Sequence, residues 1–271
     1  MLADAVAAES YKFLRQRGGL FWGFCAVPLG MLLFNLMLDT WIGTRSALPV
    51  GLDLGRQVVQ GLGLGGSAFF QIFFAAGAVS LFSGEYRWET WRLLTPRNSR
   101  ANLMAAKFIV YAALTALSLL ALGLGNALHT LYAGLLGAQV ALPGGAFPLH
   151  ALGTFLTSWA ELLVLGAVAA LLATATRAMI GPLIAAICFA FAQQMALMIL
   201  GPADARLHWF AAFPGMSAWY VRAWITGEQI MPGVFAVASR ALPGILFLLG
   251  WIALLGAAVL VRFQRQDLPR E

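Results

Sequence analysis

The chain has 271 residues, of which 61% are hydrophobic and only 10% are charged, and its formal net charge is +6. A soluble domain usually has about a quarter charged residues and less than half apolar ones. The composition therefore excludes an ordinary soluble domain and indicates a protein whose surface faces lipid.

Several uncharged runs reach the length of about 20 residues that a helix needs to cross a hydrocarbon core about 30 Å thick. The runs are continuous blocks of Leu, Ala, Phe and Gly, without the alternation that marks the strands of a membrane β-barrel. A helix also satisfies its backbone polar groups internally, as the bilayer requires. We predict an all-α integral membrane fold with six transmembrane helices, in a single transmembrane domain over residues 1–271.

The N-terminal stretch, residues 3–17, is basic and amphipathic and precedes the first apolar run. It predicts an interfacial elbow helix, or a plain anchor at the membrane surface. The apolar run that follows is longer than the core of a signal peptide, which has about 7 to 15 residues. We therefore expect this run to be a retained span. Cys25 and Cys188 lie within apolar runs, where free cysteines behave as small hydrophobic side chains.

The predicted spans are residues 19–39, 62–83, 105–131, 151–174, 179–200 and 241–262. An even number of spans places both termini on one side, and that side holds twelve of the 17 Lys and Arg residues. The positive-inside rule then predicts cytoplasmic termini in a bacterial-type plasma (inner) membrane. The five basic residues expected on the outer side are Arg45, Arg56, Arg206, Arg222 and Arg240.

The outer segment before the last span, residues 201–240, is rich in Trp, Phe, Pro and Gly. This composition does not suit a solvated loop. Irregular backbone at membrane depth is tolerated where protein or a water-filled cavity covers it. We expect short re-entrant or interfacial helices here, with a surface-lying amphipathic cap as the alternative.

Catalytic motifs are missing from the sequence. Lys12 and Lys107 are each followed by Phe, whereas the Walker A motif of an ATPase needs Lys followed by Ser or Thr. The histidines, His129, His150 and His208, are far apart and form no metal-binding motif. The basic residues are scattered and make no nucleic-acid-binding patch. We expect no catalytic site, metal or cofactor in this chain and no nucleic-acid partner.

Residues 84–104, between the second and third predicted spans, contain the densest charge cluster in the chain. Trp88 and Trp91 share one side of a short predicted helix, and Asn98 or Ser99 can cap the next span. Arg100 and Lys107 lie seven residues apart and are expected to reach along one face toward water. Taken alone, such a segment can be an ordinary basic loop that contacts anionic lipid.

The order of residues in this segment resembles a signature of the permease subunits of type 2 ATP-binding-cassette (ABC) exporters. The residues that carry the resemblance are Glu85, Thr90, Leu93, Leu94, Pro96, Arg100 and Lys107. Glu89 departs from the pattern, since the family usually has glycine before the threonine. Chain length, the amphipathic start and the six predicted spans extend the resemblance over nearly the whole chain.

The resemblance implies a permease that dimerises with a second copy or a related permease and binds a cytoplasmic ABC ATPase subunit, which would hold ATP and Mg. Residues 84–104 would then be the coupling segment, and membrane lipids would surround the spans. The residues expected to contact the ATPase are Glu85, Arg87, Trp88, Trp91, Arg92 and Arg100.

Glu161 lies near the middle of the fourth predicted span. Burying a carboxylate there costs roughly several kcal/mol unless the group is paired, protonated or hydrated. Gln193 and Gln194 in the fifth span lie at a comparable depth, and one of them could donate a hydrogen bond to Glu161. These three residues are the intramembrane polar candidates, with a structural hydrogen bond between helices as the alternative role for Glu161.

The leading hypothesis is the membrane-spanning subunit of an ATP-driven exporter that moves a hydrophobic or amphipathic substrate by alternating access. One alternative is a membrane scaffold or assembly protein that transports nothing. Another is a proton-coupled secondary transporter that uses Glu161.

Overall fold

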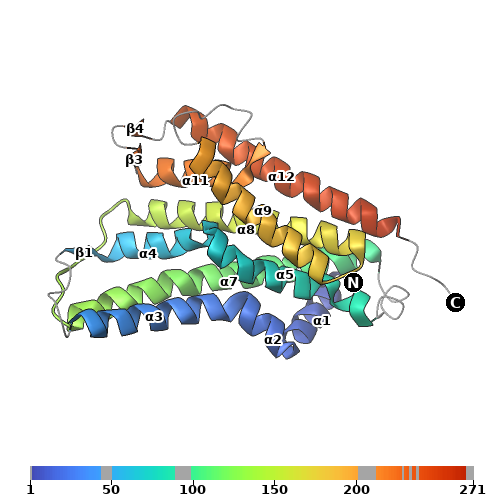
Figure 1. Cartoon of the computed structure of the whole chain (residues 1–271), viewed down its shortest axis with the longest axis horizontal. Helices are drawn as coiled ribbons and strands as arrows, with labels where there is room; N and C mark the ends of the chain where they lie inside the picture. Colours follow the sequence, from blue (N-terminus) through green and yellow to red (C-terminus); the bar gives the residue numbers. More distant parts are fainter. Residues whose placement is uncertain are drawn as a thin grey trace.

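The computed structural model describes residues 2–43, 51–88, 99–200, 212–227, 229–231, 234–235 and 238–266. Long helices dominate it (Figure 1). Both termini lie at one end of the bundle, and the short strands lie at the other end. The elements in chain order are α1 (Leu2–Arg15), α2 (Arg17–Leu20), the π-helical turn η1 (Phe21–Cys25), α3 (Ala26–Gly43), β1 (Leu52–Asp53), α4 (Leu54–Gly63), the 3-10 turn η2 (Leu64–Gly66), α5 (Ala68–Trp88), α7 (Arg100–Leu135), β2 (Val140–Ala141), α8 (Phe147–Thr176), α9 (Ile180–Leu200), α11 (Pro214–Thr226), β3 (Gln229–Met231), β4 (Val234–Phe235) and α12 (Ala238–Gln264).

Six helical segments in the described part of the chain are long and apolar enough to cross a membrane. They are Arg17–Trp41, Ala68–Tyr86, Arg100–Leu135, Phe147–Thr176, Ile180–Leu200 and Ala241–Gln264. The predicted all-α membrane fold with six spans is therefore confirmed. The strands form two-stranded pairs, β1 with β2 and β3 with β4.

The second span begins later than the sequence indicated. The prediction started it at residue 62, but the chain forms the separate helix α4, turns through η2 and then enters α5. Asp53 caps α4 by accepting a hydrogen bond from the Arg56 backbone at 2.9 Å. Because α4 packs against α7 and α8, this part of the chain is a broken helix inside the bundle (Figure 1).

Helix α11 occupies part of the outer segment for which short helices were predicted. It packs against α8, α9 and α12, and Met216, Ser217, Ala218 and Tyr220 are buried. Pro214 stands at its start, and Gly227, at φ 67°, ends it in the left-handed region, which glycine adopts without steric cost. Helix α11 is therefore an internal element of the bundle and not the surface-lying amphipathic cap that the sequence also allowed.

The core is centred on aromatic side chains from three spanning segments. Phe24 contacts Phe74 and Tyr111 through edge-to-face ring pairs. The Tyr111 hydroxyl donates to the Leu162 carbonyl at 3.1 Å. Gly166 must lack a side chain, because a Cβ there would lie 2.1 Å from the Tyr111 ring. This packing holds the first span, α5, α7 and α8 together.

Candidate functional site

Four charged side chains meet at the end of the bundle that holds the termini. Lys107 of α7 donates to Glu85 Oε1 of α5 at 2.7 Å and to Glu9 Oε2 of α1 at 3.0 Å. Lys12 of α1 bonds Glu9 Oε1 at 2.7 Å and also pairs with Glu85. We call Glu9, Lys12, Glu85 and Lys107 the charged junction.

The charged junction is buried, although charged side chains almost never are unless they are paired. Lys107 is 0% exposed, Glu85 2% and Glu9 5%. Lys107 also donates to the Leu81 carbonyl at 2.8 Å. Removing one member of such a group leaves an uncompensated buried charge, which typically costs about 3–5 kcal/mol. The junction therefore fixes α1, α5 and α7 to one another.

Lys12 is the outermost member of the junction, with 39% of its side chain exposed. Burial lowers its pKa, but the carboxylates of Glu85 and Glu9 outweigh this effect and raise the pKa above the ordinary value of 10.5. Lys12 therefore stays charged at neutral pH. The junction thus brings together two lysines and two glutamates.

A second set of bonds ties the same end of the bundle to α8 and α12. Arg100 Nη1 donates to the carbonyls of Gln264 at 3.0 Å and Gln266 at 2.6 Å, at the end of α12. The Tyr86 hydroxyl bonds Gln266 Oε1 at 2.9 Å, and Gln266 Nε2 donates to the Thr174 carbonyl at 2.5 Å. The segment between α5 and α7 is thus flanked on both sides by bonds to other helices.

The structure places the predicted coupling residues in different surroundings. Glu85 is buried in the charged junction, and Arg100 contacts the end of α12. Arg87 and Trp88 form the last turn of α5, but their side chains lie outside the described residues, as do Trp91 and Arg92 altogether. Contact of these residues with an ATPase stays a prediction.

Ser99 caps α7, as the sequence predicted for Asn98 or Ser99, because its side chain accepts from the Asn102 backbone at 3.2 Å. The expectation for Lys107 was wrong. Its side chain does not reach along the helix toward water but turns into the charged junction, where two carboxylates stabilise it. Helix α7 packs against α1 near its own start, which places Lys107 beside Glu9.

Glu161 lies in an ion pair in the middle of the bundle. Arg222 Nη1 of α11 is 2.6 Å from Glu161 Oε2, and Gln71 Nε2 of α5 donates to Glu161 Oε1 at 3.0 Å. Arg222 Nη1 also lies 3.5 Å from Ser158 Oγ. The sequence analysis counted Arg222 among the basic residues of the outer side and did not indicate this ion pair, which the buried helix α11 makes possible by bringing Arg222 to α8.

The break between α4 and α5 lies beside this pair. Gln71 Nε2 donates to the Gly65 carbonyl at 3.2 Å, which satisfies an acceptor that the break frees. A Cβ on Gly66 would lie 2.3 Å from Arg222 Nη2, so only glycine lets the guanidinium approach. Broken helices inside a membrane protein are tolerated where the backbone is buried in protein or lines an aqueous cavity.

Gln193 and Gln194 line a small cavity with Glu161 and Arg222, but the expected bond from one of them to Glu161 is not the one found. Gln193 Oε1 accepts from the Gly215 backbone at 2.9 Å and so holds the start of α11. The glutamine that donates to Glu161 is Gln71. Two features of the sequence could have pointed to these partners. Gln71 is a lone amide in an apolar run, and Arg222 is a lone arginine between aromatic residues.

Three adjoining cavities form what we call the polar cleft. The largest of the three, about 760 Å³, lies between the start of α4, the start of α8 and the end of α11. Figure 1 shows these parts of the helices at the end of the bundle opposite the termini. It shares Val59, Gln60 and Thr226 with a cavity of about 270 Å³. That cavity shares Gly66, Trp219 and Arg222 with a third, of about 60 Å³, which reaches Glu161.

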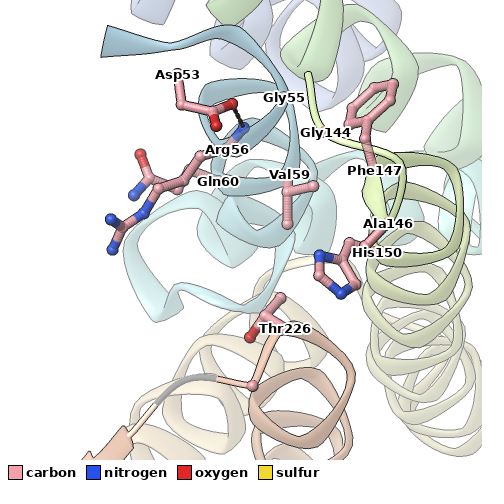
Figure 2. Close-up of a pocket in the computed structure, with 11 residues that line it drawn as sticks. Asp53, Gly55, Arg56, Val59, Gln60, Gly144, Ala146, Phe147, His150 and Thr226 are labelled. Carbon is pink, nitrogen blue, oxygen red and sulfur yellow. Dashed lines mark hydrogen bonds between the residues drawn. The ribbon is translucent and has the colours of Figure 1, made fainter. Parts of the chain in front are cut away.

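Figure 2 shows the mouth of the polar cleft. Arg56 and Gln60 extend together from α4, and His150 of α8 and Thr226 of α11 lie across from them. The dashed line is the cap bond from the Arg56 backbone to Asp53. The polar side chains at the mouth are Asp53, Arg56, Gln60, His150 and Thr226, and they stand among apolar residues and glycines.

Within the described residues, His, Cys, Asp and Glu side chains make no group of three or more that could hold a metal ion. Cys25 and Cys188 are free thiols. The chemistry available at both polar clusters is that of ion pairs and hydrogen bonds, which suits binding and conformational coupling.

These features define a multi-pass, all-α membrane protein with an amphipathic N-terminal helix and a charged junction at the end that holds its termini. The chain belongs to the ABC-2 family of transporter proteins, whose family model matches residues 5–193. A comparison with curated proteins gives no match. The family comprises membrane components of transporters, and membership implies that the chain works with an ATPase subunit.

Proposed function

We propose that this chain is the membrane-spanning permease subunit of an ATP-driven exporter in the plasma membrane, with both termini in the cytoplasm. A separate cytoplasmic subunit binds ATP and Mg and hydrolyses the ATP. The permease pairs with a second copy or a related permease and moves a hydrophobic or amphipathic substrate by alternating access. The apolar, Phe-rich interior of the bundle supports that substrate class.

The observation that carries the proposal is the pair of anchors on either side of residues 89–98. On one side, Glu85 bonds Lys107 and Lys12, which joins the end of α5 to α7 and α1. On the other side, Arg100 bonds the end of α12. A partner that moves this segment would move four helices together, because packed helices shift as rigid bodies.

The amphipathic helix α1 supports the same role. Its Glu9 and Phe13 are buried against the bundle, while Tyr11 and Leu14 are exposed at 60% and 57%. An amphipathic helix of this kind lies in the membrane interface. Through the charged junction, a force applied from the cytoplasm on α1 would also reach α5 and α7.

The proton-coupled alternative gains no support from Glu161, which already has Arg222 and Gln71 as partners. This is the arrangement of a structural ion pair. The scaffold alternative differs from the exporter in that ATP hydrolysis by an associated subunit would not depend on the charged junction.

The test uses the chain reconstituted in lipid with its candidate ATPase subunit, comparing the wild type with two variants. The double variant Trp88→Ala with Arg92→Ala should lose the ATPase subunit in co-purification. The double variant Glu85→Gln with Lys107→Met should retain the ATPase subunit. It should lose at least about half of the ATP hydrolysis that the permease stimulates, because the ion pair that joins α5 to α7 is removed. The matched control is Arg262→Gln, at an exposed arginine of the same end.

Association of an ATPase with the wild type, lost only in the first variant, supports the proposal. If no ATPase associates with the wild type, the exporter function is refuted. If hydrolysis is the same in the wild type and in Glu85→Gln with Lys107→Met, the charged junction is not the coupling element.

A further inference from the structure

The polar cleft lies within one chain and ends at the ion pair of Glu161 and Arg222. Its lining changes from Arg56, Gln60 and His150 at the mouth to Thr154, Ser67 and Trp219 at middle depth. The deepest part is lined by Glu161 and Arg222. Glu161 lies about 21 Å along α8 from its start at Phe147, at 1.5 Å per residue.

The carboxylates that line the cleft are already engaged by donors of this chain. Asp53 Oδ1 accepts the cap bond from Arg56. Glu161 Oε1 accepts from Gln71, and Oε2 pairs with Arg222. Glu161 is therefore not placed to serve as the counter-ion of a cationic ligand, while Asp53 uses one of its two oxygens in the helix cap.

The cations have donors to spare. Arg222 binds Glu161 and Ser158 through Nη1, whereas a guanidinium carries five N–H donors on three nitrogens. The Arg56 side chain is exposed at the mouth. A planar guanidinium is suited to bidentate recognition of carboxylate or phosphate groups.

The base of the cleft is built to keep Arg222 in place. Glu161 holds one nitrogen at 2.6 Å. Gly66 leaves space for the second terminal nitrogen, Nη2, because a Cβ on residue 66 would lie 2.3 Å from it. Arg222 lines both the middle and the deepest cavity, so its guanidinium is reached from the cleft.

We propose that the polar cleft is a binding site for an anionic head group, a carboxylate or a phosphate, with Arg222 as its principal donor and Arg56 as the donor at the mouth. Glu161 is the positioning residue that holds Arg222. The site belongs to a single chain and does not depend on the ATPase. The anion can come from a lipid-like molecule or from a free anion in the water on that side.

The test measures binding to the purified chain in phosphatidylcholine nanodiscs, without an ATPase. The probes are dodecyl phosphate, inorganic phosphate and, as the cationic counterpart, dodecyl trimethylammonium. Trp219 lines the cleft, so its fluorescence reports binding, and Trp219→Phe identifies its share of the signal. The key variant is Arg222→Gln with Glu161→Gln, which removes both charges together, and the control is Arg17→Gln at the opposite end.

Dodecyl phosphate should bind saturably, and the double variant should raise its Kd about tenfold to hundredfold, as expected for one charged hydrogen-bonded contact. Arg17→Gln should leave the Kd unchanged. Competition by inorganic phosphate identifies a free anion as sufficient, and lack of competition identifies a lipid-like ligand. Equal affinity in the wild type and the double variant, or equal binding of the cationic probe, would overturn the proposal.

A second measurement does not depend on the stability of the double variant. In a chain with Cys25→Ser and Cys188→Ala, Thr226→Cys should react with a membrane-impermeant thiol reagent added on the side opposite the termini. Dodecyl phosphate should slow this reaction, and it should slow it less when Gly66→Ala displaces Arg222. Reaction only from the side of the termini, or no protection by dodecyl phosphate, would contradict the site.

Discussion

Arg222 Nη1 lies 2.6 Å from Glu161 Oε2, although the two residues are 61 positions apart in the sequence. The side chains are only 13% and 7% exposed. The pair joins α11 to α8 in the middle of the bundle, next to the break between α4 and α5. It is both the end of the polar cleft and a bond on which the position of α11 depends.

Neutralising one member of this pair should destabilise the chain more than neutralising both. Arg222→Gln alone or Glu161→Gln alone leaves one buried charge, so each should cost about 3–5 kcal/mol. The double variant leaves neither charge unpaired, so it should cost less than either single variant. Unfolding in mixed micelles, followed by circular dichroism, gives all four values. Additive costs would show that the two side chains do not interact.

Lys107 should be the member of the charged junction whose loss costs most. Lys107→Met leaves Glu9 and Glu85 buried with Lys12 as their remaining partner, and should lower the free energy of unfolding by about 3–5 kcal/mol. Lys12→Met is the matched comparison. Its effect should be clearly smaller, because Lys12 is partly exposed and Lys107 still compensates both carboxylates. Equal losses in unfolding experiments would contradict this ranking.

The contribution of Lys12 should vanish only at high pH. Its pKa in the folded chain is raised above the ordinary value of 10.5, so its stabilising effect is fully present below pH 10.5 and is lost as the pH rises through the folded pKa. The difference in melting temperature between the wild type and Lys12→Gln should be constant from about pH 6 to 9 and shrink above about pH 10.5. A difference that shrinks below pH 9 would refute this assignment.

Gly23 should tolerate no side chain. A Cβ there would lie 2.5 Å from the Gly77 Cα, where the first and second spans cross. Gly23→Ala must push two backbones apart and should cost about 1–3 kcal/mol, the usual cost of overpacking.

The control for this prediction is Gly30→Ala in the same span, where nothing lies within 4 Å of the added Cβ. It should be neutral, or stabilising by up to about 1 kcal/mol through helix propensity. Thermal unfolding of both variants in one detergent gives the comparison. Equal effects of the two substitutions would mean that the crossing is looser than the structure shows.

The sequence by itself determined the fold class and the number of spans, and it narrowed the cap of α7 to Asn98 or Ser99. These features depend on local properties, since about 20 apolar residues in a row must be buried in hydrocarbon wherever they occur. The cap needs only a hydroxyl three residues before a free backbone N–H. Glu161 was also recognisable, because a carboxylate within an apolar run has to be satisfied somehow.

Only the tertiary structure decided which partners these charges find. The glycine-rich run at residues 61–66 continues the apolar pattern of the second span, so hydropathy could not show that the chain breaks there. Lys107 and Glu9 are 98 positions apart, and their meeting depends on how α1 packs beside α7. Ion pairs of this kind are set by the relative positions of whole helices, which packing fixes and the local sequence does not encode.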